Sequence, residues 1–466
     1  MFALLTLSGS ASSAWAQETG REGTKEVEVA FDSLCVRVID GRTVAEWLRP
    51  VFRQDDFTLR ARNGFDEGNG FTRFWGDVVI VEKGDTIRAE RVRYHRDDKV
   101  GEAQGNVRLT DGEVILEAPS GRYFSEEERT IFNEGVVYRD SNATLTADRA
   151  RYHSADNRAE FVQNVVLEQD DMTLQADSVL HLREDETSRA WGRIAAEQID
   201  LADSVRTFIL ADSLYRNAPI DSIRVSGNTS LIRIDESAAD TLFLRAATID
   251  VLAGDALEAA DSVIVLAAGY ALRSDSLVSF KDLAGRRVSQ ISGSPRAWVE
   301  DTQLTADRFD LLEGAVVDTI NGTGDVFVAT PDSLSGRVNQ LKGDRLLVTL
   351  IDDSLRVLDI RGRSQAVLFM ESEEYGTPVG FRGSGDGLRF AFSGGDLDRV
   401  AFYSGVEGTY YAAHLLEQLS NLSGFIFSPD DRPRRHPVLA AFWFGYLDRT
   451  VRPQNSGTET LCGQDC

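Results

Sequence analysis

Residues 71–182 repeat with a fixed period of 29 residues. The period is visible where one residue type recurs in successive copies: Val78, Val107, Val136 and Val165; Ala89, Ala118, Ala147 and Ala176; and Tyr94, Tyr123 and Tyr152, with His181 in the fourth place. A fixed period indicates one structural unit laid down repeatedly, in which each copy buries its apolar face against the next. Function is therefore expected on a long stacked surface rather than in one catalytic pocket.

Each unit is predicted to consist of two antiparallel strands and two turns. In the copy Gly105–Ala118, Val107 and Leu109 alternate with polar residues, which is the two-residue period of a half-buried strand. Asp111 and Gly112 follow as a hairpin turn, because both residue types tolerate positive φ. A second strand completes the segment, and turn-like residues occupy the same places in the other copies.

The second strand of each unit changes its apolar parity at one fixed place. Leu145 and Ala147 share one face, whereas Ala150 and Tyr152 share the opposite parity. Such a change implies a bulge or bend, by which a strand can pass from one sheet to a facing one. We therefore predict an all-β fold, an elongated antiparallel β-jelly roll or twisted two-sheet stack of ~29-residue repeats with a short mixed C-terminal tail. A parallel β-helix is the alternative, but its coils need no hairpin turn inside each unit.

The chain is predicted to contain five segments: 1–16 signal peptide, 17–70 N-terminal lead-in, 71–217 regular β repeats, 218–412 divergent β repeats, and 413–466 C-terminal tail. In the divergent block the period loosens, but the Ala-Asp-Arg/Ser and Gly-Asp/Asn elements of the repeat recur. Glycine-rich residues 371–400 are interpreted as turns around a last hairpin. Residues 412–419 suggest a short helix, and the apolar stretch 439–447 a cap over an open end of the sheets.

The N-terminus predicts export to the periplasm, with or without association with the outer membrane. A short apolar stretch at residues 1–7 is followed by a small-x-small cleavage site ending at Ala16. Cys462 and Cys466 could pair and leave Cys35 free, although the simpler interpretation is that no cysteine is essential to the fold. No run approaches the roughly 20 apolar residues of a membrane-spanning helix.

The formal net charge of −25 excludes several classes of partner. An acidic surface argues against nucleic acid, whose phosphates require a basic face. It argues equally against electrostatic adhesion of the whole surface to anionic membranes. A salt-rich habitat would explain the acidity without any functional role.

Three motifs carry a resemblance to a known family: Gly105-Asn106-Val107 with Leu116-Glu117-Ala118, the run Leu145–Tyr152, and Val406–Tyr411. Together they make residues 71–411 resemble the OstA/LptA family of periplasmic lipopolysaccharide-transport proteins. The family implies a β-jelly roll open along one side, whose apolar interior holds lipid A acyl chains, and head-to-tail stacking into a bridge between membranes. Acyl chains gain roughly 0.8 kcal/mol per buried CH₂, and unpaired edge strands invite strand addition by a like domain.

The resemblance implies a non-enzymatic carrier of lipopolysaccharide or a similar envelope lipid, without cofactor or metal, that joins other OstA/LptA-like components through edge strands. The alternatives are a secreted repeat protein that binds or acts on polysaccharide, and a purely structural envelope scaffold. The candidate lipid-facing residues are apolar positions that recur in the repeat, and each would also serve as plain core: Val78, Ile80, Val107, Leu109, Leu116, Ala118, Val136, Tyr138, Leu145, Ala147, Val165, Leu167, Leu174 and Ala176.

Three further sets of residues are candidates for binding sites. Arg91 and Arg149 hold equivalent places two units apart and could meet lipid phosphates, but a solvated face paired with nearby acids is the simpler interpretation. His95 and His153 are better explained as exposed turn residues than as a metal site. The motif Gly383-x-Gly385-x-Gly387 precedes no clear helix, so it does not predict a phosphate cradle.

Overall fold

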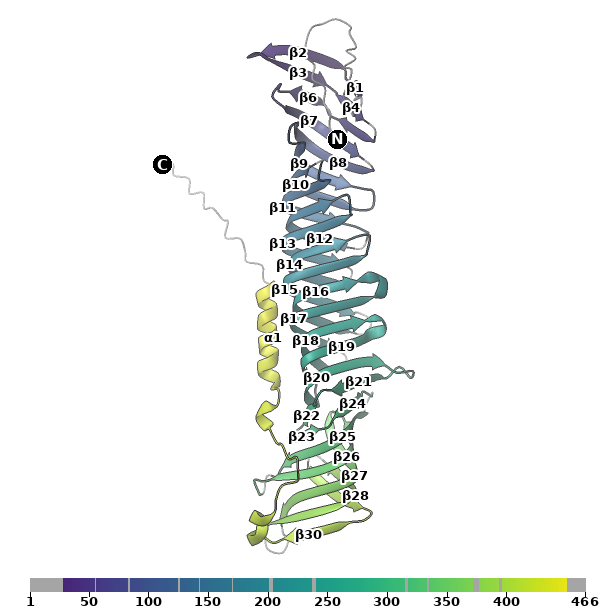
Figure 1. Cartoon of the computed structure of the whole chain (residues 1–466), viewed down its shortest axis with the longest axis vertical. Coiled ribbons are helices and arrows are strands. Elements are labelled where there is room, and N and C mark those ends of the chain that lie inside the picture. Colours follow the sequence, from purple (N-terminus) through teal and green to yellow (C-terminus); the bar gives the residue numbers. More distant parts are fainter. Residues whose placement is uncertain are drawn as a thin grey trace, which may run out of the picture. The chain divides into compact units, whose positions relative to one another are not determined.

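The computed structural model describes residues 28–450, with gaps at 55, 83, 125, 142, 170, 201–203, 237–239, 315–316, 333–334, 372–376 and 394–395. Antiparallel strands dominate it, and one long helix lies beside them (Figure 1). Contacts within the chain define two compact units, unit 1 up to Gly192 and unit 2 from Arg193. The predicted signal peptide and the Cys462–Cys466 pair lie outside the described residues, whereas Cys35 is an exposed free thiol.

The strands of unit 1 are β1 Glu28–Ala30, β2 Ser33–Ile39, β3 Arg42–Leu48, β4 Val51–Gln54, β5 Phe57–Arg60, β6 Asn63–Asp66, β7 Phe71–Glu82, β8 Asp85–His95, β9 Val100–Thr110, β10 Ile115–Phe124, β11 Arg129–Arg139, β12 Ala143–His153, β13 Arg158–Gln169 and β14 Met172–Leu182. From β7 to β14 each strand pairs antiparallel with the next. One 29-residue period is therefore two strands and two turns, as the sequence predicted.

The strand β15 Thr187–Asp200 crosses from unit 1 into unit 2. Unit 2 continues with β16 Val205–Asn217, β17 Ser222–Asp235, β18 Asp240–Leu252, β19 Ala256–Leu266, β20 Tyr270–Lys281, β21 Arg287–Ser292, β22 Arg296–Val299, β23 Thr302–Thr305, β24 Arg308–Leu312, β25 Val317–Pro331, β26 Val338–Ile351, β27 Ser354–Glu371, β28 Pro378–Ser393, β29 Asp396–Tyr403 and β30 Glu407–Tyr411. Its helical elements are η1 Ala218–Ile220, η2 Ala253–Asp255, η3 Ala413–Gln418, η4 Pro429–Asp431 and α1 Arg435–Thr450. The predicted boundary near 217 falls at η1, between two paired strands, whereas the contacts divide the chain at Gly192.

A corner in the middle of each odd-numbered repeat strand redirects the chain. Two consecutive residues there adopt positive φ, +78° and +45° at Gly105 and Asn106, and +68° and +51° at Gln163 and Asn164. The register with both neighbouring strands shifts at the same places. The predicted parity change of the second strand lies opposite these corners: in β12 it falls between Ala147 and Ala150, where the register with β11 and β13 shifts. The bulge itself is in the odd-numbered strand, which it bends and twists.

In three of the corners, an asparagine donates to an acidic side chain of the preceding strand. Three asparagines make the same bond from Nδ2: Asn106 to Glu90 Oε1 at 2.9 Å, Asn164 to Asp148 Oδ2 at 2.8 Å, and Asn228 to Asp212 Oδ2 at 2.7 Å. The third of these lies in unit 2, so both units use the same corner. At Asn228 and Asp212 the Gly-Asn and Ala-Asp elements of the sequence are the two halves of one structural joint.

The corners divide the repeat strands into two facing sheets. Sheet 1 holds the part of each odd-numbered strand before its corner and the part of each even-numbered strand after it, and sheet 2 holds the rest. The sheets meet along the corners and end in hairpin turns on the opposite, open side. Aromatic rings cross between them, with centroids 5.5 Å apart for Phe52 and Phe74 and 5.6 Å apart for Tyr138 and Phe161. The core of unit 1 lies in this trough between the sheets.

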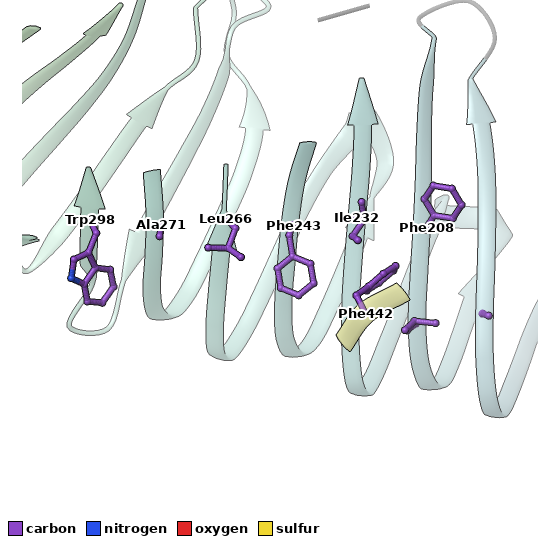
Figure 2. Close-up of a cluster of buried hydrophobic side chains, with 9 residues drawn as sticks. Phe208, Ile232, Phe243, Leu266, Ala271, Trp298 and Phe442 are labelled. Carbon is purple, nitrogen blue, oxygen red and sulfur yellow. The ribbon is translucent and has the colours of Figure 1, made fainter. Parts of the chain in front are cut away.

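In unit 2 the outer face of sheet 2 is apolar as well. One row of directly paired residues crosses six strands, and Figure 2 shows its side chains: Phe208, Ile232, Phe243, Leu266, Ala271 and Trp298. Their neighbours in the same strands, such as Leu244 and Val265, are buried on the inner face. Strands that are apolar on both faces need a cover on each.

The C-terminal segment supplies that cover. Phe442 of α1 is buried against the row, and Phe208 packs on Trp443 with ring centroids 4.9 Å apart. Farther along the same outer face, Gln303 and Gln340 are almost fully buried and bond the backbone of residues 421–428. We call residues 412–450 the strap, because this segment runs back along strands that precede it in the sequence (Figure 1).

The structure differs from two of the sequence-based predictions for this region. Residues 439–447 belong to α1 and cover a sheet face, because outward positions of β16–β20 are apolar; they do not cap an open end. Within the glycine-rich stretch, Gly380, Gly383, Gly385 and Gly387 belong to the strand β28 rather than to turns, whereas Gly376, Gly394 and Gly395 lie outside the described residues. Beside Gly380, β28 leaves room for Leu416 and Leu419 of the strap. The short helix predicted at 412–419 is confirmed as η3. Among the described residues, no helix is sufficiently long and apolar to traverse a bilayer.

Replacing Gly105 by alanine tests the corner. We expect the free energy of unfolding to fall by about 1–2 kcal/mol, because left-handed backbone costs an L residue roughly that much. A Cβ there would also lie 2.8 Å from Cβ of Glu90. Gly101→Ala, in the same strand with ordinary φ and no heavy atom within 4 Å of the new Cβ, is the control. Urea unfolding at unchanged m-value provides the comparison, and equal midpoints for the two variants would contradict the corner's need for glycine.

Candidate functional site

The candidate lipid-facing residues all come from the inner face of sheet 2 in unit 1. Eleven of the fourteen are buried, and Ile80, Tyr138 and Leu167 are half-buried. Toward the corner, the trough is filled by rings such as Phe74, Phe132 and Phe161, each at most 1% exposed. Open space must therefore lie between this packed base and the open side.

An apolar cavity occupies that position in the first repeats. Its volume, which includes space open to solvent, is about 640 Å³. Of the candidate residues, Ile80, Val107 and Leu109 line it. The other candidates lie along the same inner face but do not line this cavity.

Sequence reasoning missed the opposite wall. Besides the candidates, the cavity is lined by Phe57 and Leu59 of the lead-in and, on sheet 1, by Val92, Tyr94, Gly101, Ala103, Gly121, Tyr123, Thr130 and Phe132. These sheet 1 positions lie across the corner from the candidates, on the flipped parity. The signal was available, because Tyr94 and Tyr123 follow the same 29-residue step as the candidates.

A row of tyrosines on sheet 1 marks the change from apolar to polar surroundings. The hydroxyl of Tyr123 donates to Glu82 Oε2 of sheet 2 at 3.2 Å, so this bond crosses the trough. Burial raises the pKa of Tyr94 and Tyr123 above the ordinary value, and it raises the pKa of Tyr152 to about 12. All three phenols are therefore neutral at physiological pH, and Tyr123 and Tyr152 line the cleft at the open side.

A charged cluster spans the open side. Arg183 follows β14 at the edge of sheet 1, and its guanidinium bonds Asp111 and Glu113 in the turn between β9 and β10, at the edge of sheet 2. The partners are 72 and 70 residues away in the sequence, so this contact joins different repeats across the trough. We call the three residues the latch. A polar cleft of about 1250 Å³, again counted to its open side, lies beside it.

The cleft has more carboxylates than cations. Its lining includes Glu82, Asp85, Asp111 and Glu128, with Arg183 as the cation among the lining residues. Burial, then the charges of Asp111 and Glu82, raise the pKa of Asp85. Asp111 behaves oppositely: burial opposes ionisation, but backbone N–H groups of the turn and Arg183 together lower its pKa. Arg183 is thus the counter-charge on which this acidic lip depends.

The other polar candidates lie away from the trough. Arg91 and Arg149 are exposed on the outside of the sheets. His95 contacts Asp98 at 2.5 Å within its own turn, and partial burial lowers the pKa of His153. No cluster of metal-ligating side chains occurs in the part of the chain that the structure describes.

Comparison with known proteins bears on the two-sheet repeat. Residues 144–241, from β12 to β18, match the family "LptA/(LptD N-terminal domain) LPS transport protein". The repeat is LptA-like. Among solved structures, the chain matches LptH from Pseudomonas aeruginosa, the LptA homologous periplasmic component of a lipopolysaccharide transport device. The identity is 12%, the match covers 36% of this chain and 83% of LptH, and the TM-score is 0.15. The search of curated proteins finds no match.

The match covers parts of both the regular and the divergent repeats. It begins inside the strictly periodic block and continues past Leu182 into the divergent block. The corners with asparagine and acid recur on both sides of that point, at Asn164 and at Asn228. The strands that follow Leu182, up to β18, therefore keep this architecture after the 29-residue period is lost.

Removing the latch cation tests the open side. We expect Arg183→Gln to lower the free energy of unfolding at neutral pH by about 1 kcal/mol, the upper range for exposed ion pairs. Because the pKa of Asp111 is lowered from 3.8, the stabilisation is present above pH 3.8 and is lost as the pH falls through the lowered value. The difference in the free energy of unfolding between the variant and the wild type should therefore disappear at acid pH.

Arg151→Gln is the matched control. Arg151 pairs with Glu160 at 3.1 Å on neighbouring strands of one sheet, so its loss breaks an exposed ion pair without touching the open side. Thermal unfolding of the three proteins across the acid range gives the comparison. If Arg183→Gln and Arg151→Gln lowered the stability by the same amount at every pH, the latch would stabilise the protein no more than an ordinary surface ion pair does.

Proposed function

We propose that this protein is a non-enzymatic carrier that holds the acyl chains of lipopolysaccharide, or of a similar envelope lipid, in the trough between its two sheets. The observation that carries the proposal is the apolar cavity, which continues the inner face of an LptA-like repeat and opens beneath a polar lip. The names of the matching family and of LptH, both concerned with lipopolysaccharide transport, support the choice of cargo.

The geometry suits an amphiphile. Alkyl chains leave water with a gain of roughly 0.8 kcal/mol for each buried CH₂, and Val107, Leu109 and Phe132 offer them an apolar wall. The neutral tyrosine hydroxyls and the charged lip then face the polar end of the same molecule. A ligand polar throughout, such as a glycan, would leave the apolar wall without a partner.

Export to the periplasm and association with like domains belong to the proposal. At the N-terminal end of unit 1, β2 pairs with β3 alone among the described strands. Leu34, Val36 and Val38 share one face of β2 and are 37%, 51% and 72% exposed. An exposed apolar edge strand is a template for strand addition, so a like β domain, including a second copy of this chain, would extend the trough.

Photo-crosslinking tests the cargo. A photoreactive residue at Leu109 should yield an adduct with lipopolysaccharide, because Leu109 lines the cavity. The same group at Arg108 is the control, since the neighbouring residue points to the outside of the same strand. Adducts at neither position, or equal adducts at both, would count against the carrier, and an adduct with a soluble glycan would favour the polysaccharide-binding alternative.

A variant that fills the cavity tests the same proposal, because it removes the space for the acyl chain. Gly101 lines the cavity, and a Cβ built on it has no heavy atom within 4 Å. Gly101→Leu should therefore place its side chain in the space proposed for an acyl chain and remove most of the Leu109 adduct. Gly101→Ala should leave the adduct in place. Unchanged labelling of the leucine variant would mean that lipid contacts Leu109 by another route.

Charges on the exposed edge test the association. The double variant Val36→Asp and Val38→Asp should abolish concentration-dependent self-association in sedimentation velocity, because inward charges blunt an edge strand. Ile220→Asp, which alters a 63% exposed residue in the turn η1, is the control. Association that persists in the double variant, or fails in the control as well, would argue against pairing through β2.

A further inference from the structure

The helix α1 is apolar on both of its long faces. Its inner face, comprising Val438, Leu439, Phe442, Trp443 and Tyr446, packs on the outer apolar row of sheet 2. The residues between them point away from the sheet and are exposed: Pro437, Ala440, Ala441, Phe444 and Leu447. Phe444 is 78% exposed and Leu447 56%. A helix that is apolar all round normally has a partner on every side, and this one is covered on one side by its own chain.

The charge beside this outer face has the opposite sign to the rest of the protein. The run Arg432–His436 contains three arginines and no acid, in a chain whose formal net charge is −25, and one of the three, Arg432, pairs with Asp301 at 3.7 Å. Arg434 and Arg435 are exposed, and neither has an ion-pair partner among the described residues. Asp448, at the far end of the helix, is the exposed carboxylate on the stripe. The apolar stripe is thus flanked by a cationic end.

We propose that the outer face of α1 docks on an anionic phospholipid surface, lying flat in the interface. At 16 residues the helix is about 24 Å long, shorter than the roughly 30 Å apolar thickness of a bilayer, so it can lie on the membrane but not cross it. Aromatic and aliphatic side chains on one face with arginines beside them are the features that seat interfacial helices. Arg434 and Arg435 would each add attraction to anionic headgroups.

The site differs from the lipid trough in place and in chemistry. It lies on the outside of unit 2, whereas the cavity lies inside unit 1. It would take a membrane surface rather than single acyl chains, and it is independent of the proposed carrier function. The acidity that excludes adhesion of the whole surface does not extend to this patch.

Vesicle flotation of the full chain tests the proposal. Wild type should float with vesicles made of equal parts of phosphatidylcholine and phosphatidylglycerol, and less with phosphatidylcholine alone. The double variant Phe444→Ser and Leu447→Ser should bind about tenfold more weakly, since burying one large apolar side chain is worth at least that factor. Arg434→Glu with Arg435→Glu should lose the preference for phosphatidylglycerol.

Leu283→Ser is the control, because Leu283 is fully exposed in the turn between β20 and β21. It should float as wild type does, and urea midpoints should be equal in all variants because the changed side chains point into solvent. The proposal fails if wild type stays with the soluble fraction, or if the helix variants float as well as the control. It also fails if light scattering shows that Phe444 and Leu447 hold two copies together instead. The Leu109 adduct of the trough should be the same in every variant.

Discussion

The fold depends on a backbone conformation that L residues avoid. Two successive residues with positive φ turn each odd-numbered repeat strand through a corner. In three of these corners a carboxylate on the preceding strand accepts a hydrogen bond from the corner asparagine. Without this joint the alternating strands would make one broad sheet, with an apolar face that nothing covers. With it, every hairpin contributes to both sheets, and stacking hairpins lengthens a two-walled trough. The same joint in unit 2 explains why the architecture survives where the 29-residue spacing does not, since strands and loops can lengthen without moving the corner.

The two units use their apolar residues differently. In unit 1 the outer positions of the repeat strands are mostly polar, and the apolar side chains converge on the trough, where they leave a cavity below the Tyr123–Glu82 contact and the latch. In unit 2, sheet 2 is apolar on both faces, and the strap covers the outer one. The buried side chains of Gln303 and Gln340 form hydrogen bonds with backbone atoms of the strap, so these bonds fix the position of the strap along the sheet. One repeat thus serves a cavity in one place and a scaffold for a helix in another.

Periodicity predicted the strands, the turns and the change of parity, because each follows from the spacing of apolar residues along a chain segment. It predicted one wall of the cavity, from Val107 and Leu109, and missed the other, because the wall formed by Val92 and Phe132 becomes a neighbour only after the corner has folded. The latch could not be predicted either, because Arg183 and Asp111 are 72 residues apart and no local sequence pattern connects them. The helix α1 could have been recognised, since Phe208 to Ala211 and Val263 to Leu266 have lost their polar alternation, which indicates a sheet face that some other part of the chain must cover.

The strap also has a consequence for the order in which the chain folds. Arg449, near its end, donates to the carbonyl oxygens of Ile194 and Ala211, which lie 255 and 238 residues earlier in the chain. Those strands precede their cover by more than 200 residues, so the row from Phe208 to Trp298 stays uncovered until the strap has folded onto it. Contacts of such sequence separation form slowly, and exposed apolar strands aggregate while they wait. The strap must therefore reach this face before other exposed strands do, if the chain is to fold rather than aggregate.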